Sequence, residues 1–175
     1  LHVALDALQA LPPGTATLTI HGNAVPYHGD ESYLNRCFQR LRPGDRVSYH
    51  GPYGLDELPA LFAGIDVLVA PALWHEAFGL TVREALAAGR PVLVSRVGGL
   101  QDAVEDGEQG FVLPPGDVAA WSAAIGRLAG DRALLAAMAR RARTRARSFA
   151  DMARELLAVY GELRGTAPPA GAARP

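Results

Sequence analysis

Short apolar runs rich in β-branched residues alternate along the chain with longer stretches of helical periodicity. Residues 65–70 (IDVLVA) are almost continuously apolar, which is typical of a strand covered by helices on both faces. The pattern predicts strands at 16–20, 46–50, 65–70, 91–95 and 111–113. It predicts helices at 1–11, 30–41, 55–62, 80–88, 101–104, 117–128, 132–145 and 149–163.

Strands separated by helices favour right-handed βαβ units and a parallel sheet. The expected fold class is α/β: a Rossmann-like, doubly wound parallel sheet of about five strands with helices on both faces. The expected domain spans residues 1–163, and residues 164–175 (RGTAPPAGAARP) have the composition of a flexible tail.

Composition narrows the class of protein further. The chain has 175 residues, of which 49% are hydrophobic and 20% charged, with a net charge of −1. The composition excludes a disordered chain, and the net charge near zero gives no overall electrostatic attraction to nucleic acid. All 17 basic residues are Arg, and Cys37 alone cannot form an internal disulfide. No apolar run reaches the length of a membrane span and no signal peptide is evident, so a cytoplasmic protein is expected.

The richest loop follows the third predicted strand, at the sheet edge where ligands bind in open parallel sheets. Phe78-Gly79 precedes the helix predicted at 80–88, so the amides of Leu80 and Thr81 face the loop and suit a phosphate. Glu84 lies one turn along the same helix face, about 6 Å further, where a carboxylate can accept hydrogen bonds from ribose hydroxyls. Glu76 precedes the helix, from where it can meet the hydroxyls of a sugar.

These residues carry a resemblance to a known family. Glu76, Phe78-Gly79-Leu80 and Glu84-Ala85-Leu86 resemble the Glu-x7-Glu motif of the retaining GT-B glycosyltransferases of group 1. The flanking segments 66–71 (DVLVAP), 87–92 (AAGRPV), 97–99 (VGG) and 106–117 (DGEQGFVLPPGD) are similar to that family in the same order. The likeness extends over residues 1–163 and identifies the chain with the C-terminal, donor-binding half of such an enzyme.

The resemblance implies a retaining hexosyltransferase that binds a nucleotide-diphosphate sugar and needs neither a metal nor a cofactor. In that family Glu84 would hold the ribose, the amides of Leu80 and Thr81 the diphosphate, and Glu76 with Phe78 and Gly79 the donor sugar. Glu76 is the predicted catalytic residue, in a positioning role. Further donor contacts are expected from Tyr49, His50 and Gly51, near the base, and from Gly98 and Gly99. For Gly98 and Gly99, a turn without any ligand contact is an equally good interpretation.

Two departures from the family bear on activity. The family carries an Arg and a Lys near its first strand, whereas no such strand precedes Leu1 and the chain contains no Lys. The acceptor-binding N-terminal domain is not part of the sequence either. The chain is therefore expected to lack transferase activity by itself and to need that domain as its partner.

Other functions compete with this interpretation. A nucleotide-sugar epimerase shares the two-domain architecture, but its acid and base residues are not evident in the sequence. A phosphoacceptor receiver would need a Lys, and a catalytically incompetent nucleotide-binding scaffold stays open. His21, His28, His50 and His75 lack metal-ligand spacing.

The arginine run at 140–147 allows peripheral contact with the inner face of a membrane, because Arg140, Arg143 and Arg147 share one helical face. A solvated helix face is the preferred interpretation of that run.

Overall fold

The computed structural model describes residues 1–165 apart from residues 24, 27 and 146–148. The chain divides into a compact unit over residues 1–145 and a second unit, of which residues 149–165 are described. Helix α8 (Phe149–Leu163) belongs to the second unit. A domain that continues to residue 163 stays a prediction, and the predicted tail lies outside the described residues from 166 onward.

The first unit contains five strands that are all parallel to their neighbours. Strands β1 (Leu18–Ile20) and β2 (Val47–Tyr49) form one sheet, and β3 (Leu68–Ala70), β4 (Val92–Ser95) and β5 (Gly110–Leu113) form another. The five predicted strands are confirmed, and the sheet is parallel as expected. It is nevertheless divided, because β1 and β3 do not hydrogen-bond to each other.

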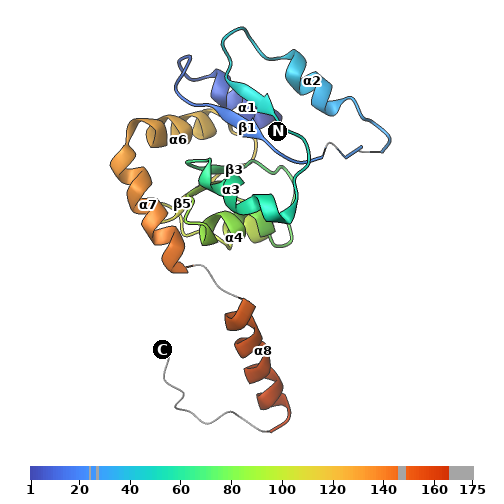
Figure 1. The fold of residues 1–175 in the computed structure, drawn as a ribbon, viewed down its shortest axis with the longest axis vertical. Helices are drawn as coiled ribbons and strands as arrows, with labels where there is room; N and C mark the ends of the chain where they lie inside the picture. Colours follow the sequence, from blue (N-terminus) through green and yellow to red (C-terminus); the bar gives the residue numbers. More distant parts are fainter. Residues whose placement is uncertain (24, 27, 146–148, 166–175) are drawn as a thin grey trace. The chain divides into compact units, whose positions relative to one another are not determined.

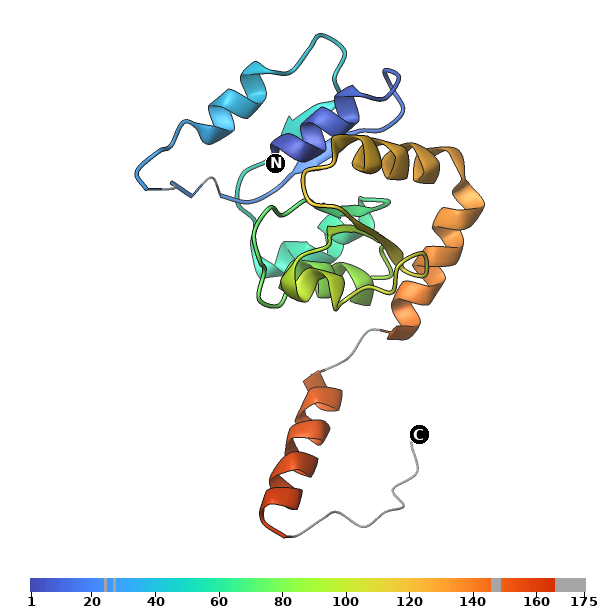
Figure 2. The same ribbon diagram turned by 180° about the vertical axis from the view of Figure 1, so that it is seen from behind.

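Helices cover both faces of these strands (Figures 1 and 2). Around the three-stranded sheet, α1 (His2–Gln9) and α6 (Val118–Gly130) lie on one side, and α3 (Leu58–Ala63) and α4 (Leu80–Ala87) on the other. The unit has two hydrophobic clusters, one on each face of this sheet, because successive side chains of β4 point to opposite faces. Val92 and Val94 pack with α4, whereas Leu93 packs with Trp121 of α6 and Met138 of α7 (Arg132–Arg145). This arrangement is the expected doubly wound α/β fold.

Two helices differ from their predicted bounds for local reasons. Helix α2 (Tyr33–Gln39) begins later than predicted, because the Asp30 carboxylate accepts the Ser32 amide at 2.8 Å and holds a turn there. The short helix α5 (Gly98–Gln101) replaces the helix predicted at 101–104, since it follows β4 after only two residues. The 3₁₀ turn η1 (Leu55–Glu57) leads into α3.

The arginine run has partners within the first unit. Arg141 forms an ion pair with Glu108 at 3.0 Å, and the Arg143 side chain lies against Gly89. Arg147 lies outside the described residues. No helix in the described part of the chain is long and apolar enough to cross a membrane.

Candidate functional site

Helix α4 begins without a side-chain cap. Its N-cap residue is Gly79, with φ 70° and ψ 56°, in the left-handed region that favours glycine. A Cβ atom there would lie 2.6 Å from Cδ2 of Leu100, so a larger residue would also have to displace that side chain. Because Gly79 has no side chain to accept a hydrogen bond, the first amides of α4, those of Leu80 and Thr81 among them, remain available to a ligand.

Two carboxylates flank this helix start. Glu76 lies in the loop between β3 and α4, and Glu84 lies on α4, one turn after Leu80. Both residues are half-buried, and neither carboxylate has a hydrogen bond or an ion pair with the residues that the structure describes. A helix N-terminus attracts an anion, and the carboxylates beside it are free to accept hydrogen bonds from hydroxyl groups. The arrangement suits a ligand that joins a phosphate to polyhydroxylated groups.

Gly98 and Gly99 lie directly against the backbone of the Glu76 loop. The Gly99 amide donates to the carbonyl oxygen of Glu76 at 2.7 Å. A Cβ atom on Gly98 would lie 2.3 Å from that same oxygen, and one on Gly99 would lie 2.4 Å from the carbonyl oxygen of Ala77. The structure therefore brings the two predicted loops together, and here the glycine pair packs against the loop that carries Glu76.

Arg83 holds the exposed Phe78 from the same helix. Its Nε donates to the carbonyl oxygen of Phe78 at 3.2 Å, and its guanidinium carbon lies 4.1 Å from the centre of the Phe78 ring. Sequence analysis gave Arg83 no role, because a cation on a helix is usually a solvated side chain. The feature of the sequence that could have indicated this contact is the five-residue spacing between Phe78 and Arg83, with the left-handed Gly79 between them.

The Arg83→Met variant should leave the fold intact but loosen the loop over residues 76–78. The variant keeps the apolar stem while losing one hydrogen bond and one cation–π contact, together worth about 1–2 kcal/mol. We expect a lower denaturation midpoint and faster amide exchange in this loop. Arg140→Met is the control, because Arg140 is exposed on α7. Equal denaturation midpoints and amide exchange rates in the two variants would show that Arg83 does not stabilise this loop.

A second group of side chains gathers where β1 and β2 end. The His21 and His50 rings stack at 4.8 Å, with the Tyr53 ring edge-on to His21 at 6.2 Å. The Tyr49 hydroxyl donates to the carbonyl oxygen of Gly22 at 2.8 Å, and the Gly22 amide donates to that of Gly51 at 2.7 Å. The Tyr49 hydroxyl and the Gly51 carbonyl thus fasten the two loops together. The His21–His50 stack was not foreseen, because only strand pairing makes the two residues neighbours.

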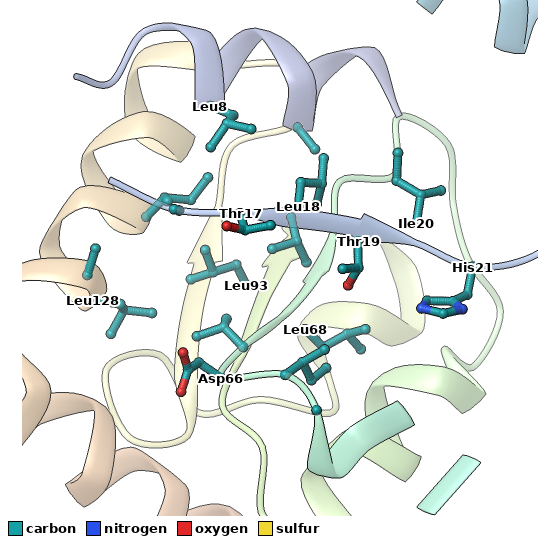
Figure 3. Close-up of a pocket in the computed structure, with 18 of the residues that line it drawn as sticks. Leu8, Thr17, Leu18, Thr19, Ile20, His21, Asp66, Leu68, Leu93 and Leu128 are labelled. Atoms are coloured by element: carbon teal, nitrogen blue, oxygen red, sulfur yellow. The ribbon is translucent and has the colours of Figure 1, made fainter. Parts of the chain in front are cut away.

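One cavity joins both groups of loops. It measures about 710 Å³, and its lining includes Tyr53, Pro71 and Thr81 as well as His21, which Figure 3 shows just beyond the end of β1. Thr81 belongs to the first turn of α4, so that turn and His21 line the same cavity, whereas Glu76, Glu84 and His50 are not among its lining residues. Within the described part of the chain, no three His, Cys, Asp or Glu side chains gather as metal ligands would.

Comparison with known proteins gives consistent results. The family described as glycosyl transferases group 1 matches residues 1–145. A D-inositol 3-phosphate glycosyltransferase of Salinispora tropica is 41% identical over 120 residues, which are 67% of this chain and 25% of that protein. The corresponding protein of Corynebacterium efficiens is 32% identical over 165 residues, 93% of this chain and 38% of that protein.

Solved structures share the fold over nearly the whole chain. Anabaena Alr3699/HepE in complex with UDP and glucose superimposes with a TM-score of 0.80 at 28% identity, covering 94% of this chain and 44% of that one. Sucrose-phosphate synthase from Thermosynechococcus elongatus gives a TM-score of 0.79 at 28% identity, covering 95% and 42%. The chain therefore spans less than half the length of each of these relatives.

Proposed function

The chain belongs to the group 1 glycosyltransferases of the GT-B fold, and on that basis we propose that it binds a nucleotide-diphosphate sugar as the donor half of a retaining hexosyltransferase. The single observation that carries this proposal is the uncapped start of α4 between two unpartnered carboxylates. Such a site offers positive potential for a diphosphate and hydrogen-bond acceptors for the sugars on either side of it.

The diphosphate would lie at the amides of Leu80 and Thr81. These amides and the helix dipole stabilise negative charge, which grows on the diphosphate as it leaves the sugar. This stabilisation comes from the protein itself, which supports a transfer that requires no bound metal. Glu84, about 6 Å further along α4, would accept hydrogen bonds from the ribose hydroxyls.

Glu76 would hold the hydroxyls of the donor sugar. In the transfer, the bond between the anomeric carbon and the diphosphate breaks with its electron pair leaving on the diphosphate. An oxygen of the acceptor hydroxyl bonds to that carbon, and its proton passes to the departing diphosphate. Glu76 acts by positioning the sugar for this step. Its loop is held by the Gly99 amide on one side and by the contact of Arg83 with Phe78 on the other.

The base would lie near residues 49–51. Uridine is the first candidate, because Anabaena HepE, at 28% identity, has been solved with UDP and with UDP-glucose. The Tyr49 hydroxyl and the Gly51 carbonyl are already hydrogen-bonded to Gly22. We therefore propose that the remaining main-chain groups of residues 49–51 and the His50 ring contact the base.

A second domain would complete the enzyme. The chain spans 25% of the Salinispora tropica relative, so the rest of such a protein provides space for an acceptor-binding domain. We propose that this N-terminal domain selects the acceptor and that the 175-residue chain alone does not catalyse transfer.

Calorimetric titration of the chain with UDP, GDP, ADP and dTDP tests the proposal. We expect UDP to bind most tightly. With the complete protein, the products made from the matching nucleotide-sugar then distinguish the classes of function. A glycoside with the anomeric configuration of the donor supports a retaining transferase, whereas an altered free nucleotide-sugar indicates an epimerase. Binding without any turnover indicates a scaffold, and a folded complete protein that binds none of the four nucleotides contradicts the proposal.

A further inference from the structure

The loop that carries Glu76 also presents a large aromatic side chain to solvent. Trp74 lies two residues before Glu76, between β3 and α4, and is 69% exposed. Its indole has neither a hydrogen bond nor a ring contact with the residues that the structure describes. Trp121, by contrast, is fully buried, and its indole Nε1 donates to the carbonyl oxygen of Pro114 at 3.1 Å. Because an indole offers a large apolar area, the exposed Trp74 suits a ligand that covers it.

The surface around Trp74 combines apolar area with one carboxylate. Leu73, Phe78 and Leu80 are exposed as well, whereas Glu76, in the middle of the same segment, is half-buried. A hexose ring has the same two kinds of surface, with hydroxyl groups around its rim and C–H bonds on its faces. The segment over residues 73–80 therefore matches a sugar ring in chemical character better than it matches a wholly polar or a wholly apolar ligand.

The backbone is fixed on both sides of Trp74. On one side, the carbonyl oxygen of Glu76 accepts a hydrogen bond from the Gly99 amide at 2.7 Å. On the other side, Leu73 packs on the turn that follows β5, since a Cβ atom on Gly116 would lie 3.6 Å from Cδ2 of Leu73. A ring on a fixed backbone loses little conformational freedom when a ligand covers it, so more of the contact energy contributes to binding.

One sugar ring can reach both Trp74 and Glu76. Two residues of fully extended chain span at most about 7 Å, so the Cα atoms of these two residues are no further apart than that. This separation is comparable with the width of a hexose and its hydroxyl groups. The ring whose hydroxyl groups bind Glu76 is therefore within reach of the indole.

We propose that Trp74 stacks on a C–H face of the donor hexose while Glu76 binds the hydroxyl groups of the same ring. This inference rests on the proposed function, because it adds a residue to the same donor site. The face of an indole is electron-rich, and it attracts the C–H bonds of a sugar. A neutral hexose with equatorial hydroxyl groups fits best, since a charged or axial polar group on the stacked face would lose its water without a partner. Trp74 thus contributes to the choice of donor sugar.

NMR of the indole N–H groups tests the contact. The chain contains two tryptophans, and the Trp74 signal is identified by its absence from the Trp74→Phe variant. We expect UDP-glucose to shift this signal and UDP to leave it nearly unchanged, because only the sugar reaches the indole. Trp121 is the internal reference, and its buried, hydrogen-bonded indole should respond to neither compound.

Calorimetric titrations measure how much the flat ring contributes to binding of the sugar. The quantity compared is the ratio of the Kd of UDP to the Kd of UDP-glucose. Trp74→Leu keeps an apolar side chain but removes the flat face, so this ratio should fall roughly 3- to 10-fold. Trp74→Phe keeps a flat ring and should lose less. The Kd of UDP itself should be the same in all three proteins, whereas a merely structural role of Trp74 would change it.

Both measurements are made with the chain and with the complete protein, and their outcomes separate the two proposals. An unchanged ratio in Trp74→Leu, or an unchanged Trp74 signal with UDP-glucose bound, would overturn the role of Trp74 and leave the proposed function standing. A Trp74→Leu enzyme altered only in its KM for the acceptor would assign the indole to the acceptor, which also contradicts the inference. Binding of neither UDP nor UDP-glucose by either protein would contradict the proposed function, and this inference with it.

Discussion

The Gly98→Ala variant is expected to lose the donor-sugar contact while the rest of the domain stays folded. A Cβ atom on Gly98 would lie 2.3 Å from the carbonyl oxygen of Glu76, and the glycine has φ 45°. The positive φ costs about 1–2 kcal/mol, and relief of the clash costs a further 1–3 kcal/mol or so. Because the clash is with backbone, the Glu76 loop must move. In the complete enzyme, a displacement of about 1 Å lowers the transfer rate roughly 100-fold.

Gly107→Ala is the matched control. Gly107 has φ 82°, but a Cβ atom there would meet nothing within 4 Å, so this variant incurs only the conformational cost. Thermal unfolding and titrations with the nucleotide and with its nucleotide-sugar compare the two variants. Gly98→Ala should lose the extra affinity that the sugar provides, while nucleotide affinity changes little. Identical behaviour of the two variants would mean that Gly98 forms only a turn.

The Glu84→Ala variant should bind the nucleoside diphosphate about 10- to 100-fold more weakly. This expectation follows from the loss of a charged acceptor for the ribose hydroxyls, worth about 1.5–3 kcal/mol. The sign is informative. Removing a negative charge near an anionic ligand would by itself strengthen binding, so weaker binding indicates a lost direct contact.

Glu31→Ala provides the control for charge. Glu31 is exposed in the segment between β1 and α2, and its replacement changes the net charge by the same amount. Calorimetric titration with UDP should show no weakening for this variant. A Glu84→Ala protein that binds UDP as tightly as Glu31→Ala would contradict the ribose contact. Glu84→Gln, which keeps the shape and part of the hydrogen bonding, should lie between the alanine variant and the natural protein.

Much of the candidate site was predictable from local sequence. The start of α4 was expected at Leu80 and is found there, because the residue before it, Gly79, adopts a left-handed backbone conformation that favours glycine. The position of Glu84 relative to Leu80 then follows from helix geometry alone. The ligand roles of Glu76, Glu84 and the other site residues stay predictions until binding is measured.

The contacts between loops were not predictable in the same way. Gly98 and Gly99 were equally well read as a turn, and only the packing of the loops after β3 and β4 shows the contact with Glu76. Arg83 has no role in the sequence analysis, since its contact with Phe78 depends on the direction in which the loop leaves Gly79. The His21 and His50 rings meet because β1 and β2 pair in parallel and in that register.

Local sequence was sufficient to predict the five strands and their alternation with helices, because periodicity and turn residues act over a few neighbours. The family followed from the motif that joins Glu76 to Glu84 and from the segments that flank it. The division of the strands into two sheets could not be predicted, since hydrogen bonding between strands depends on which distant segments lie side by side in the folded chain. The same holds for the glycine contact with Glu76 and for the cavity that residues of β1 and β3 both line. Both depend on distances between residues far apart in the chain, and no local pattern specifies those distances.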